Sequence, residues 1–518
     1  MSYQIEQKIG TSTYVYQVES YWDKEKKQAR QKRKYLGKKD PDSGKIINKS
    51  EQQAIKMVYD FGSAYLVQEV IKHCGIRENI ESIFASHSSL IIKLIIFDVI
   101  ESEPLYLFQS WHEGVYGIKQ AKTSSQYISD FTVKVGEMEY QRELFIQKWV
   151  KHQKDDQGIF FDITSFSSYS NMIDIVEWGY NRDGENLPQV NFGILLGFPS
   201  NLPLLYSVHQ GSISDVTTLK NISAKLESLN LKKITLVLDR GFYSKENILE
   251  MHNSFENFII PMPFSTKVSL ELLEVCKNIT SPKNLFYHNK KAIFYYKHKF
   301  EIKGKDVYSH LFFDEERRSR ELSKFMSRIS EIEDDLQIIE FKTIEEANIY
   351  LKENYRNETR YFTTYPLKNT IKCCRDNENM TQTIDRMGKM ILLTKQDMDK
   401  EKVLNLYKDR ESVEHCFDIL KNEMNHNRLR VKSRKAMEGR LFLVFMGIIV
   451  RKYIANVMKE KNLYKKMTYK EMLLELRKLK SIKLVNNKTH LSEISRKQKM
   501  ILKAFGVKIP SSESPALI

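Results

Sequence analysis

The chain has 518 residues, of which 82 are Lys or Arg and 66 are Asp or Glu, which gives a formal net charge of +16. This length exceeds a single hydrophobic core, so several domains are expected. The cation excess and the pI of about 9.2 favour a polyanionic partner, although general solubility or an anionic membrane surface would account for the same excess. The five cysteines lack the spacing of a metal framework, which excludes a zinc fold and indicates incidental thiols in a reducing cytosol.

Segments that would export the chain or anchor it in a membrane are not predicted. The N-terminus lacks a basic region followed by a long apolar core. The apolar run 90–100 is interrupted by Lys93 and Asp98, and the run 441–450 is too short to span a bilayer. We therefore expect a soluble protein with no membrane contact.

Residues 1–60 are predicted to form a basic β-hairpin region. Strand patterns run over 14–21 and 29–36, and a turn-rich stretch over 40–50 indicates a boundary. The cations that crowd this hairpin are Lys24, Lys26, Lys27, Arg30, Lys32, Arg33, Lys34, Lys38 and Lys39. Such a unit suits contact with a DNA backbone, for which Lys32, Arg33 and Lys34 are our candidates. A solvated hairpin whose lysines protect its edges fits equally well.

Residues 61–155 show helical periodicity. Helices are predicted at 64–74, 76–84, 90–100 and 137–152. A helical layer next to a basic hairpin suits the binding of DNA ends. No clear helix-turn-helix is present, so a purely structural layer is an equal alternative.

Residues 156–263 alternate between strand and helix. The predicted strands are 158–166, 190–197, 203–209, 232–239 and 258–262, with helices at 215–229 and 244–253. Three strands followed by alternating helix and strand predict an α/β fold with a mixed sheet covered by helices.

Two acids in this region lie at strand positions. Asp162 interrupts the apolar run of the strand that begins at Gly158, and a lone buried carboxylate is costly unless something pairs with it. Asp239 lies where a β-branched strand runs into a Gly-containing turn. Each acid alone is more often an ordinary strand-end or turn carboxylate, so the pair indicates a site only together with a third acid.

Residues 264–388 are predicted to form a separate insertion domain. Strand-like aromatic segments at 285–287, 292–300 and 307–313 precede a charged helical stretch from Glu315. Aromatic strands with lysines can form a stacking platform for bases. They more often form the faces of an ordinary small sheet.

Residues 389–460 contain the third acid. At about 100° per residue, Tyr407, Arg410, Glu414 and Lys421 fall within an arc of roughly 60° on one helix face. This face suits a metal ion bound by the carboxylate and a phosphate bound by the Arg, Lys and Tyr donors. A solvated face with ion pairs between neighbouring turns is the alternative.

An apolar helix is predicted at 438–458, and the lysine-rich tail 461–518 is predicted to be partly helical. Asp162, Asp239 and Glu414 together form a set that can hold two divalent cations over a phosphodiester.

The motifs around these acids resemble those of DDE transposases of bacterial insertion sequences. The segment 407–421 matches the Tyr-x2-Arg-x3-Glu-x6-Lys signature of one group at every fixed position. The segment 161–165 resembles that group's D-x-T/S strand, and 238–242 resembles its D-R-G/E-F turn. A further segment, 211–219, is similar to the family's G-x3-D segment, although Ser212 stands where relatives often carry Asn.

The resemblance runs from about residue 120 to 455 and implies an RNase H-like mixed sheet flanked by helices. A large β-rich insertion, 264–388, would separate Asp239 from Glu414, so that the core comprises 156–263 and 389–460. The N- and C-terminal regions would be helical apart from the basic hairpin.

The resemblance also implies the roles of individual residues. Asp162 would bridge two Mg²⁺ ions, for which Mn²⁺ can substitute, while Asp239 and Glu414 each complete one coordination sphere. DNA phosphates would be held by the remaining signature side chains and by the cation of the second motif. These residues are Tyr407, Arg410, Lys421 and Arg240.

The activity implied by the resemblance is cut-and-paste transposition in the bacterial cytoplasm, near the nucleoid. The protein would bind terminal inverted repeats, cleave DNA through a hairpin intermediate and transfer the strand, working as a homodimer across two ends with the tail 461–518 as a dimerisation region. An RNase H-like nuclease without strand transfer, or an inactive DNA-binding relative, are the alternatives.

Overall fold

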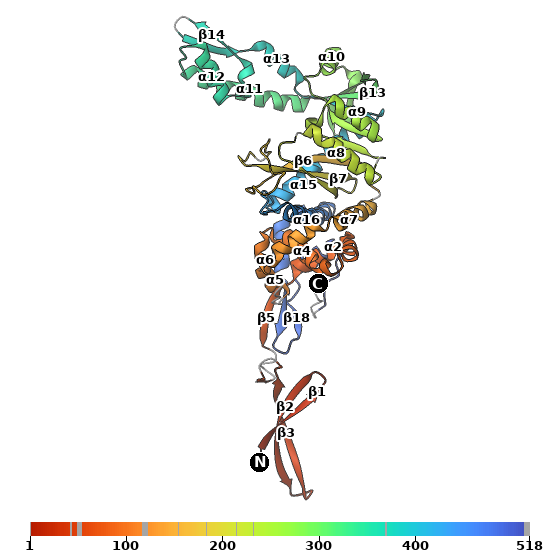
Figure 1. The fold of residues 1–518 in the computed structure, drawn as a ribbon, viewed down its shortest axis with the longest axis vertical. Helices are drawn as coiled ribbons and strands as arrows, with labels where there is room; N and C mark the ends of the chain where they lie inside the picture. The colour runs from red at the N-terminus through yellow and green to blue at the C-terminus, as the bar shows by residue number, and fades with distance from the viewer. Residues whose placement is uncertain are drawn as a thin grey trace.

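The molecule is elongated, and its parts follow one another along the long axis (Figure 1). A small N-terminal sheet lies at one end, followed by a helical layer, a large central sheet and an arm that projects sideways. The computed structural model describes residues 2–41, 44–48, 54–116, 123–153, 155–182, 184–213, 215–231, 233–367 and 370–511. Parts of three expected features lie outside the described residues: 42–43 and 49–50 of the boundary stretch, Ser214 and the side chain of Asp215 in the G-x3-D segment, and 512–518 of the tail.

The N-terminal sheet has four strands rather than the two expected. Its strands are β1 (Ser2–Ile9), β2 (Ser12–Asp23), β3 (Gln28–Lys39) and β4 (Ile46–Ile47), each antiparallel to the next. Strand β1 was not predicted. Nearly all of its side chains are exposed, so its sequence lacks the apolar alternation that indicates a strand.

A second small sheet joins distant parts of the chain. Strand β17 (Lys480–Leu484) pairs with both β5 (Ile55–Asp60) and β18 (Thr489–Leu491). The C-terminal region therefore contains strands as well as α17 (Tyr469–Arg477) and α18 (Arg496–Ala504).

The helical layer packs around one long helix, α16 (Arg434–Glu460). The surrounding helices are α2 (Gly62–His73), α3 (Ile76–Phe84), α4 (Ser88–Glu101), α5 (Phe108–Tyr116), α6 (Ser125–Glu137) and α7 (Glu139–His152). The backbones of α6 and α16 pack very closely, since a Cβ atom at Gly439 would lie 2.0 Å from the Thr132 carbonyl oxygen. Two helical stretches, Ile76–Glu101 and α16, have the length and apolarity to cross a membrane, but 56% and 83% of their most apolar windows are buried in the protein, as in core helices.

The central sheet has nine strands in the order β11-β12-β13-β16-β10-β9-β6-β7-β8. One half follows the expected strand and helix order closely. Its elements are β6 (Gly158–Ser167), β7 (Gln189–Phe198), β8 (Pro203–Gln210), α8 (Asp215–Ser228), β9 (Thr235–Leu238), α9 (Lys245–Ser254) and β10 (Asn257–Pro261). Strands β6, β7 and β8 are antiparallel, while β9 and β10 run parallel to β6, a mixed α/β arrangement consistent with an RNase H-like core.

The other half of the sheet uses strands that we expected in the insertion. Strands β11 (Leu285–His288), β12 (Lys291–Ile302) and β13 (Lys305–Asp314) extend the central sheet, because β16 (Lys389–Thr394) pairs with β10 on one side and β13 on the other. Alternation identified these segments as strands but carries no information about their partners. Helix α10 (Lys267–Val275) precedes them.

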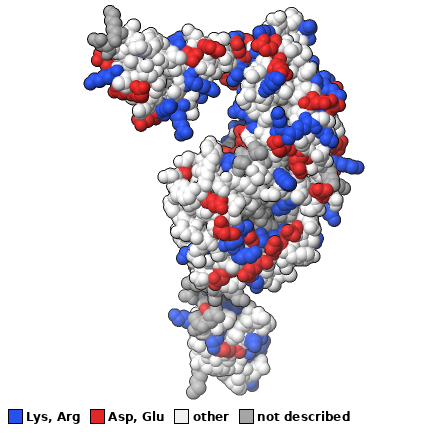
Figure 2. Space-filling model, turned by 45° about the horizontal axis from the view of Figure 1, so that its top comes forward, with Lys and Arg blue, Asp and Glu red and all other residues white. Residues whose placement is uncertain are grey.

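The projecting arm is the part of the insertion with a core of its own. It consists of α11 (Glu315–Ile338), α12 (Ile344–Asn354), β14 (Phe362–Leu367), β15 (Thr370–Arg375) and α13 (Asn377–Arg386). Its separate core includes Ile329, Ile332, Phe341, Leu351 and Tyr361. Figure 2 shows a hollow beneath the arm, with Lys and Arg side chains interspersed with Asp and Glu on the arm's lower side.

The remaining elements contain the signature segment and short turns. Helix α14 (Lys400–Asp409) is followed by α15 (Glu411–Asp418) and a π-turn at Ile419–Glu423. Short 3-10 turns lie at Ala85–His87, Leu105–Leu107, Arg240–Phe242, Pro282–Asn284, Thr359–Tyr361 and Leu463–Lys465.

Candidate active site

Asp162 lies in the middle of β6 and is the one residue of that strand whose side chain is not fully buried. Burial of the carboxyl raises the pKa of Asp162 to about 6. The Ile163 N–H, which donates to Oδ1 at 2.8 Å, and the Arg410 guanidinium act in the opposite direction. The hydrogen bond and the nearby cation therefore offset only part of the cost of burying the negative charge of Asp162.

Asp239 lies beside Asp162 because of the register between their strands. Strand β9 runs parallel to β6 with Leu238 paired to Phe161, so the residues that follow each of these are neighbours across the sheet. The turn after Asp239 is fixed by Phe242, whose ring packs against that of Phe161 with centroids 5.0 Å apart. The two acids are thus placed by ordinary sheet pairing and one aromatic contact.

The signature segment is not the single continuous helix that we predicted. Helix α14 ends at Asp409 and α15 begins at Glu411, with Arg410 at the junction. Hydrogen bonds three residues apart, from the Arg410 N–H to Tyr407 O and from the Val413 N–H to Arg410 O, tighten the chain at this point. The rotation of 100° per residue therefore does not extend unbroken through the segment.

Arg410 lies at the centre of the three predicted acids. Its Nη2 is 2.8 Å from Glu414 Oε1 and 3.7 Å from Asp239 Oδ1, and its Nη1 is 3.8 Å from Asp162 Oδ2. The guanidinium carbon is 5.6 Å from the centre of the Tyr407 ring. The sheet and the signature segment thus bring three carboxylates together around one cation.

The donor set suits hard divalent cations such as Mg²⁺, which prefer carboxylate oxygens. Among the described residues, no group of His, Cys, Asp and Glu is arranged to hold a metal ion as it stands. The Arg410 guanidinium instead lies among Asp162, Asp239 and Glu414. These three carboxylates are the groups that would hold a divalent cation here.

Tyr407 and Lys421 occupy different surroundings. Tyr407 is partly buried beside Arg410, and burial raises the pKa of its phenol. Lys421 is only 8% exposed and lies in the π-turn, where its electrostatic neighbour is Glu185. The structure therefore gathers Tyr407, Arg410 and Glu414, whereas Lys421 faces the connection between β6 and β7.

The other candidate DNA contacts are exposed. Arg240 follows Asp239 directly and lies at the surface. Lys32, Arg33 and Lys34 are exposed on β3, at the far end of the molecule from the catalytic sheet (Figure 1). Because successive strand residues point to opposite faces, Lys32 and Lys34 share one face and Arg33 lies on the other.

Arg182 is a site neighbour that the sequence did not indicate. It lies in the β6–β7 connection, where its charge lowers the pKa of Asp162. Its Nη1 donates to Asn191 Oδ1 at 3.3 Å. No periodicity or motif marks this residue, so only the folded connection places it near the acids.

Buried cations of α16 support the signature segment from below. Lys452 donates from Nζ to Ser412 O at 3.0 Å. Arg451 is fully buried, forms an ion pair with Glu423 and lies with its guanidinium carbon 3.5 Å from the centre of the Tyr469 ring. Two adjacent charges within an apolar helix were the sequence signal that could have indicated this support.

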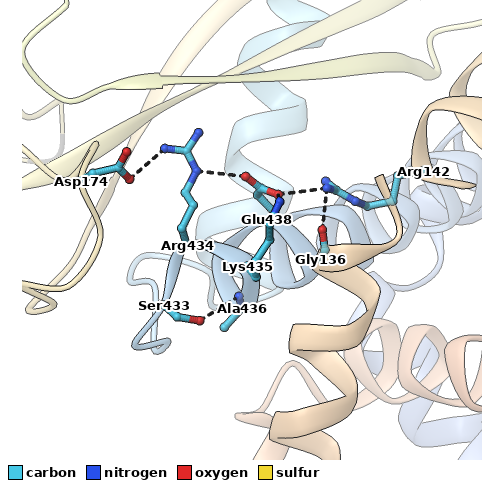
Figure 3. Close-up of polar contacts among 8 residues, drawn as sticks. All are labelled: Gly136, Arg142, Asp174, Ser433, Arg434, Lys435, Ala436 and Glu438. Carbon is cyan, nitrogen blue, oxygen red and sulfur yellow. Dashed lines mark hydrogen bonds and ion pairs between the residues drawn. The ribbon is translucent and has the colours of Figure 1, made fainter. Parts of the chain in front are cut away.

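Figure 3 shows how α16 is tied to its surroundings. Glu438 accepts hydrogen bonds from Arg434 at 3.0 Å and from Arg142 at 3.0 Å, and Arg142 also donates to Gly136 O at 2.8 Å. Arg434 reaches Asp174 of the β6–β7 connection at 3.1 Å. This network links α6 and α7 to the connection beside the site.

A family model described as the transposase DDE domain matches residues 153–450. The chain belongs to this DDE transposase family. The matched span, more than half of the chain, contains Asp162, Asp239 and Glu414, and membership implies DNA binding and metal-dependent phosphoryl transfer. The particular group of insertion sequences is a finer assignment and is taken up below.

This DDE transposase also has a distant likeness among solved structures. It is similar to a chain in the cryo-EM structure of a piggyBac transposase synaptic complex with hairpin DNA, at 10% identity and a TM-score of 0.34. That alignment covers 75% of this chain and 69% of the other. A search of curated proteins found no match.

Proposed function

We propose that the chain is the transposase of a bacterial insertion sequence of the Tyr-x2-Arg-x3-Glu-x6-Lys group. It binds terminal inverted repeats and performs Mg²⁺-dependent cleavage and strand transfer by cut and paste, through a hairpin intermediate. The observation that carries this proposal is the convergence of Asp162, Asp239 and Glu414 around Arg410.

The chemistry follows from the charges at this point. Two bound divalent cations would activate the attacking hydroxyl and stabilise the leaving 3′ oxygen. Asp162 and Asp239 on neighbouring interior strands and Glu414 on α15 hold the site's negative charge, while Arg410, once released from them, is free to donate to DNA phosphates. Arg has donors and no acceptor, so its role is to orient the scissile phosphate rather than to bind metal.

The outer parts of the molecule fit the same function. We propose that the basic hairpin region 1–60 and the helical region 61–155 hold the transposon end, and that 461–518 pairs two transposases across two ends. The core comprises 156–263 and 389–460, interrupted by the insertion 264–388, and the protein acts in the bacterial cytoplasm at the nucleoid. The exposed cations of β3 and of the arm's lower side support contacts with phosphates.

The decisive experiment uses DNA carrying the inverted repeats that flank the gene, incubated with the full chain in Mg²⁺. We expect nicked, hairpin and joined products on a denaturing gel. Glu414→Gln should abolish all three while leaving end binding intact, because it removes a metal ligand and no phosphate contact. The matched control is Glu411→Gln, an exposed acid of the same helix that forms no ion pair with Arg410 among the described residues.

Reversed effects of the two substitutions would show that the wrong acid had been assigned. Cleavage without joined products would identify a nuclease instead of a transposase.

A further inference from the structure

The connection between β6 and β7 carries an unusual set of exposed apolar side chains. Tyr169, Met172, Trp178 and Tyr180 are 67%, 77%, 63% and 83% exposed. Single exposed apolar residues are common, but several large ones in one short segment indicate a binding surface.

The backbone that carries these rings is firmly held. Glu177 and Gln189 exchange backbone hydrogen bonds of 3.0 and 2.9 Å, and Gln189 Nε2 donates to Tyr180 O at 2.8 Å. Gly179 lies against Gly211, since a Cβ atom at Gly179 would be 2.1 Å from the Gly211 carbonyl oxygen. The rings therefore project into solvent from a fixed support, which is the requirement for stacking at low entropic cost.

A row of cations lies alongside the connection. The segment 428–432 runs beside the end of β6, with the Leu429 N–H donating to Ser167 O at 3.0 Å. Arg428, Arg430 and Lys432 are exposed at alternating positions of this segment. In the described part of the chain, Arg430 and Lys432 have no ion pair, which leaves their charge for an external anion.

Rings and cations meet at the edge of the catalytic site. The Arg428 guanidinium carbon is 5.4 Å from the centre of the Tyr169 ring, and its Nη2 is 2.8 Å from Glu185 Oε1. Lys421 of the signature segment acts electrostatically on the same Glu185. Arg182, two residues after Tyr180, acts on Asp162.

We infer that the β6–β7 connection and segment 428–432 form a binding surface for unpaired bases of DNA next to the cut. Tyr169, Trp178 and Tyr180 stack on bases, and the alternating cations take the phosphates between them. Every base presents a π-face, so the surface tolerates any sequence. The inference rests on the proposed function and adds to it the single-stranded character of the DNA held beside the acids.

The experiment measures fluorescence anisotropy of labelled oligothymidylate and of a blunt duplex with the full chain in EDTA, which prevents cleavage. The Trp178→Ala/Tyr180→Ala double variant should lose about 10-fold or more in affinity for the single strand, as expected for lost base stacking. Its duplex affinity should stay within about twofold, because phosphate contacts dominate duplex binding. Trp178→Phe/Tyr180→Phe should restore single-strand binding.

Tyr140→Ala is the matched control, since Tyr140 is 71% exposed on α7 and outside this surface. Equal losses on single strand and duplex, or no loss on either, would overturn the inference. A changed sedimentation coefficient of the DNA-free double variant would also overturn it, because the rings would then contact a second copy of the chain.

Failure of this inference and failure of the proposed function are distinguishable. A wild-type chain that cleaves and joins inverted-repeat DNA, with a double variant that binds oligothymidylate normally, refutes only the stacking surface. A chain that never cleaves but loses single-strand binding on ring removal refutes only the transposase assignment.

Discussion

A single guanidinium, that of Arg410, lies among three carboxylates. Its one positive charge offsets only part of theirs. In the function that we propose, Arg410 has two separate tasks: it holds Asp162, Asp239 and Glu414 together until a divalent cation binds them, and it then donates to phosphate.

Removal of this cation should strengthen metal binding. Arg410→Ala is expected to raise Mn²⁺ affinity in the absence of DNA by roughly tenfold, because a competing positive charge near three acids is lost. Isothermal titration calorimetry and electron paramagnetic resonance of Mn²⁺ measure this without any turnover. Hairpin formation and strand transfer should nevertheless fall more than the first nick, since phosphate positioning is lost.

Arg240→Ala is the control for the metal titration, because Arg240 is exposed and forms no ion pair with the acids among the described residues. A variant at Arg410 with weaker metal binding, a lower melting temperature and equal loss at every step would show that Arg410 serves only the fold.

The raised pKa of Asp162 predicts a pH-dependent stability. Its folded pKa of about 6 exceeds the ordinary carboxyl pKa of 3.8, so the folded state binds the proton more tightly and stability falls as pH rises between these values. Asp162→Asn should therefore raise the free energy of unfolding at pH 7.5 by on the order of 2 kcal/mol and change it little at pH 4. Urea unfolding in EDTA at both pH values measures the difference.

If Asp162→Asn changed the free energy of unfolding equally at the two pH values, burial would not be raising the pKa of this carboxyl. Asp162 would then titrate as an ordinary surface carboxyl.

At the scale of elements, the contact between α6 and α16 sets the position of the signature segment from below. Gly439→Ala would place a Cβ atom 2.0 Å from Thr132 O, so the two helices must separate. We expect a loss of about 1–3 kcal/mol in the free energy of unfolding, larger than the gain of about 1 kcal/mol from helix propensity. Thermal or urea unfolding of the full chain measures it.

Gly114→Ala is the matched control, because Gly114 lies in α5 with no atom within 4 Å of its added Cβ. That substitution should stabilise the protein by about 0.5–1 kcal/mol. Equal changes in the free energy of unfolding for the two substitutions would show that α6 and α16 can separate at no energetic cost.

Much of the central fold was predictable because its signals are local. Strands β6 to β10 have apolar runs bounded by turns. Asp162 interrupts β6 and Asp239 directly follows β9, so pairing of the two strands brings the acids together. The break at Arg410 was not predictable, since it accompanies the attraction of one side chain to acids from distant strands.

The pairing partners of the strands could not be predicted from the sequence either. Strand β13 has the alternation of any half-buried strand, and only the position of β16 between it and β10 decides that it extends the central sheet. Arg182 likewise owes its place near Asp162 to the path of the β6–β7 connection, which has no regular structure.

At the scale of the whole molecule, the N-terminal sheet, the helical layer, the central sheet and the arm follow one another along the long axis. The basic N-terminal sheet lies at one end and the arm at the other, with the acids between them (Figure 1). The hollow beneath the arm opens a space beside the central sheet (Figure 2). In the function that we propose, the exposed cations of β3 and of the arm would meet phosphates of one long DNA segment on either side of the three acids.

The pairing of β5 with β17 also has a consequence for the order in which the protein is made. Strand β5 leaves the ribosome early, but its partner begins only at Lys480, and the N–H groups of Phe61 and Gly62 bond to Leu479 O. At an elongation rate of roughly 5–20 residues per second, this edge stays open for about 20–80 s while the central sheet and the arm are synthesised. The helical layer is thus among the first parts of the chain to emerge and among the last to close, so a prematurely terminated transposase lacks the strand that completes it.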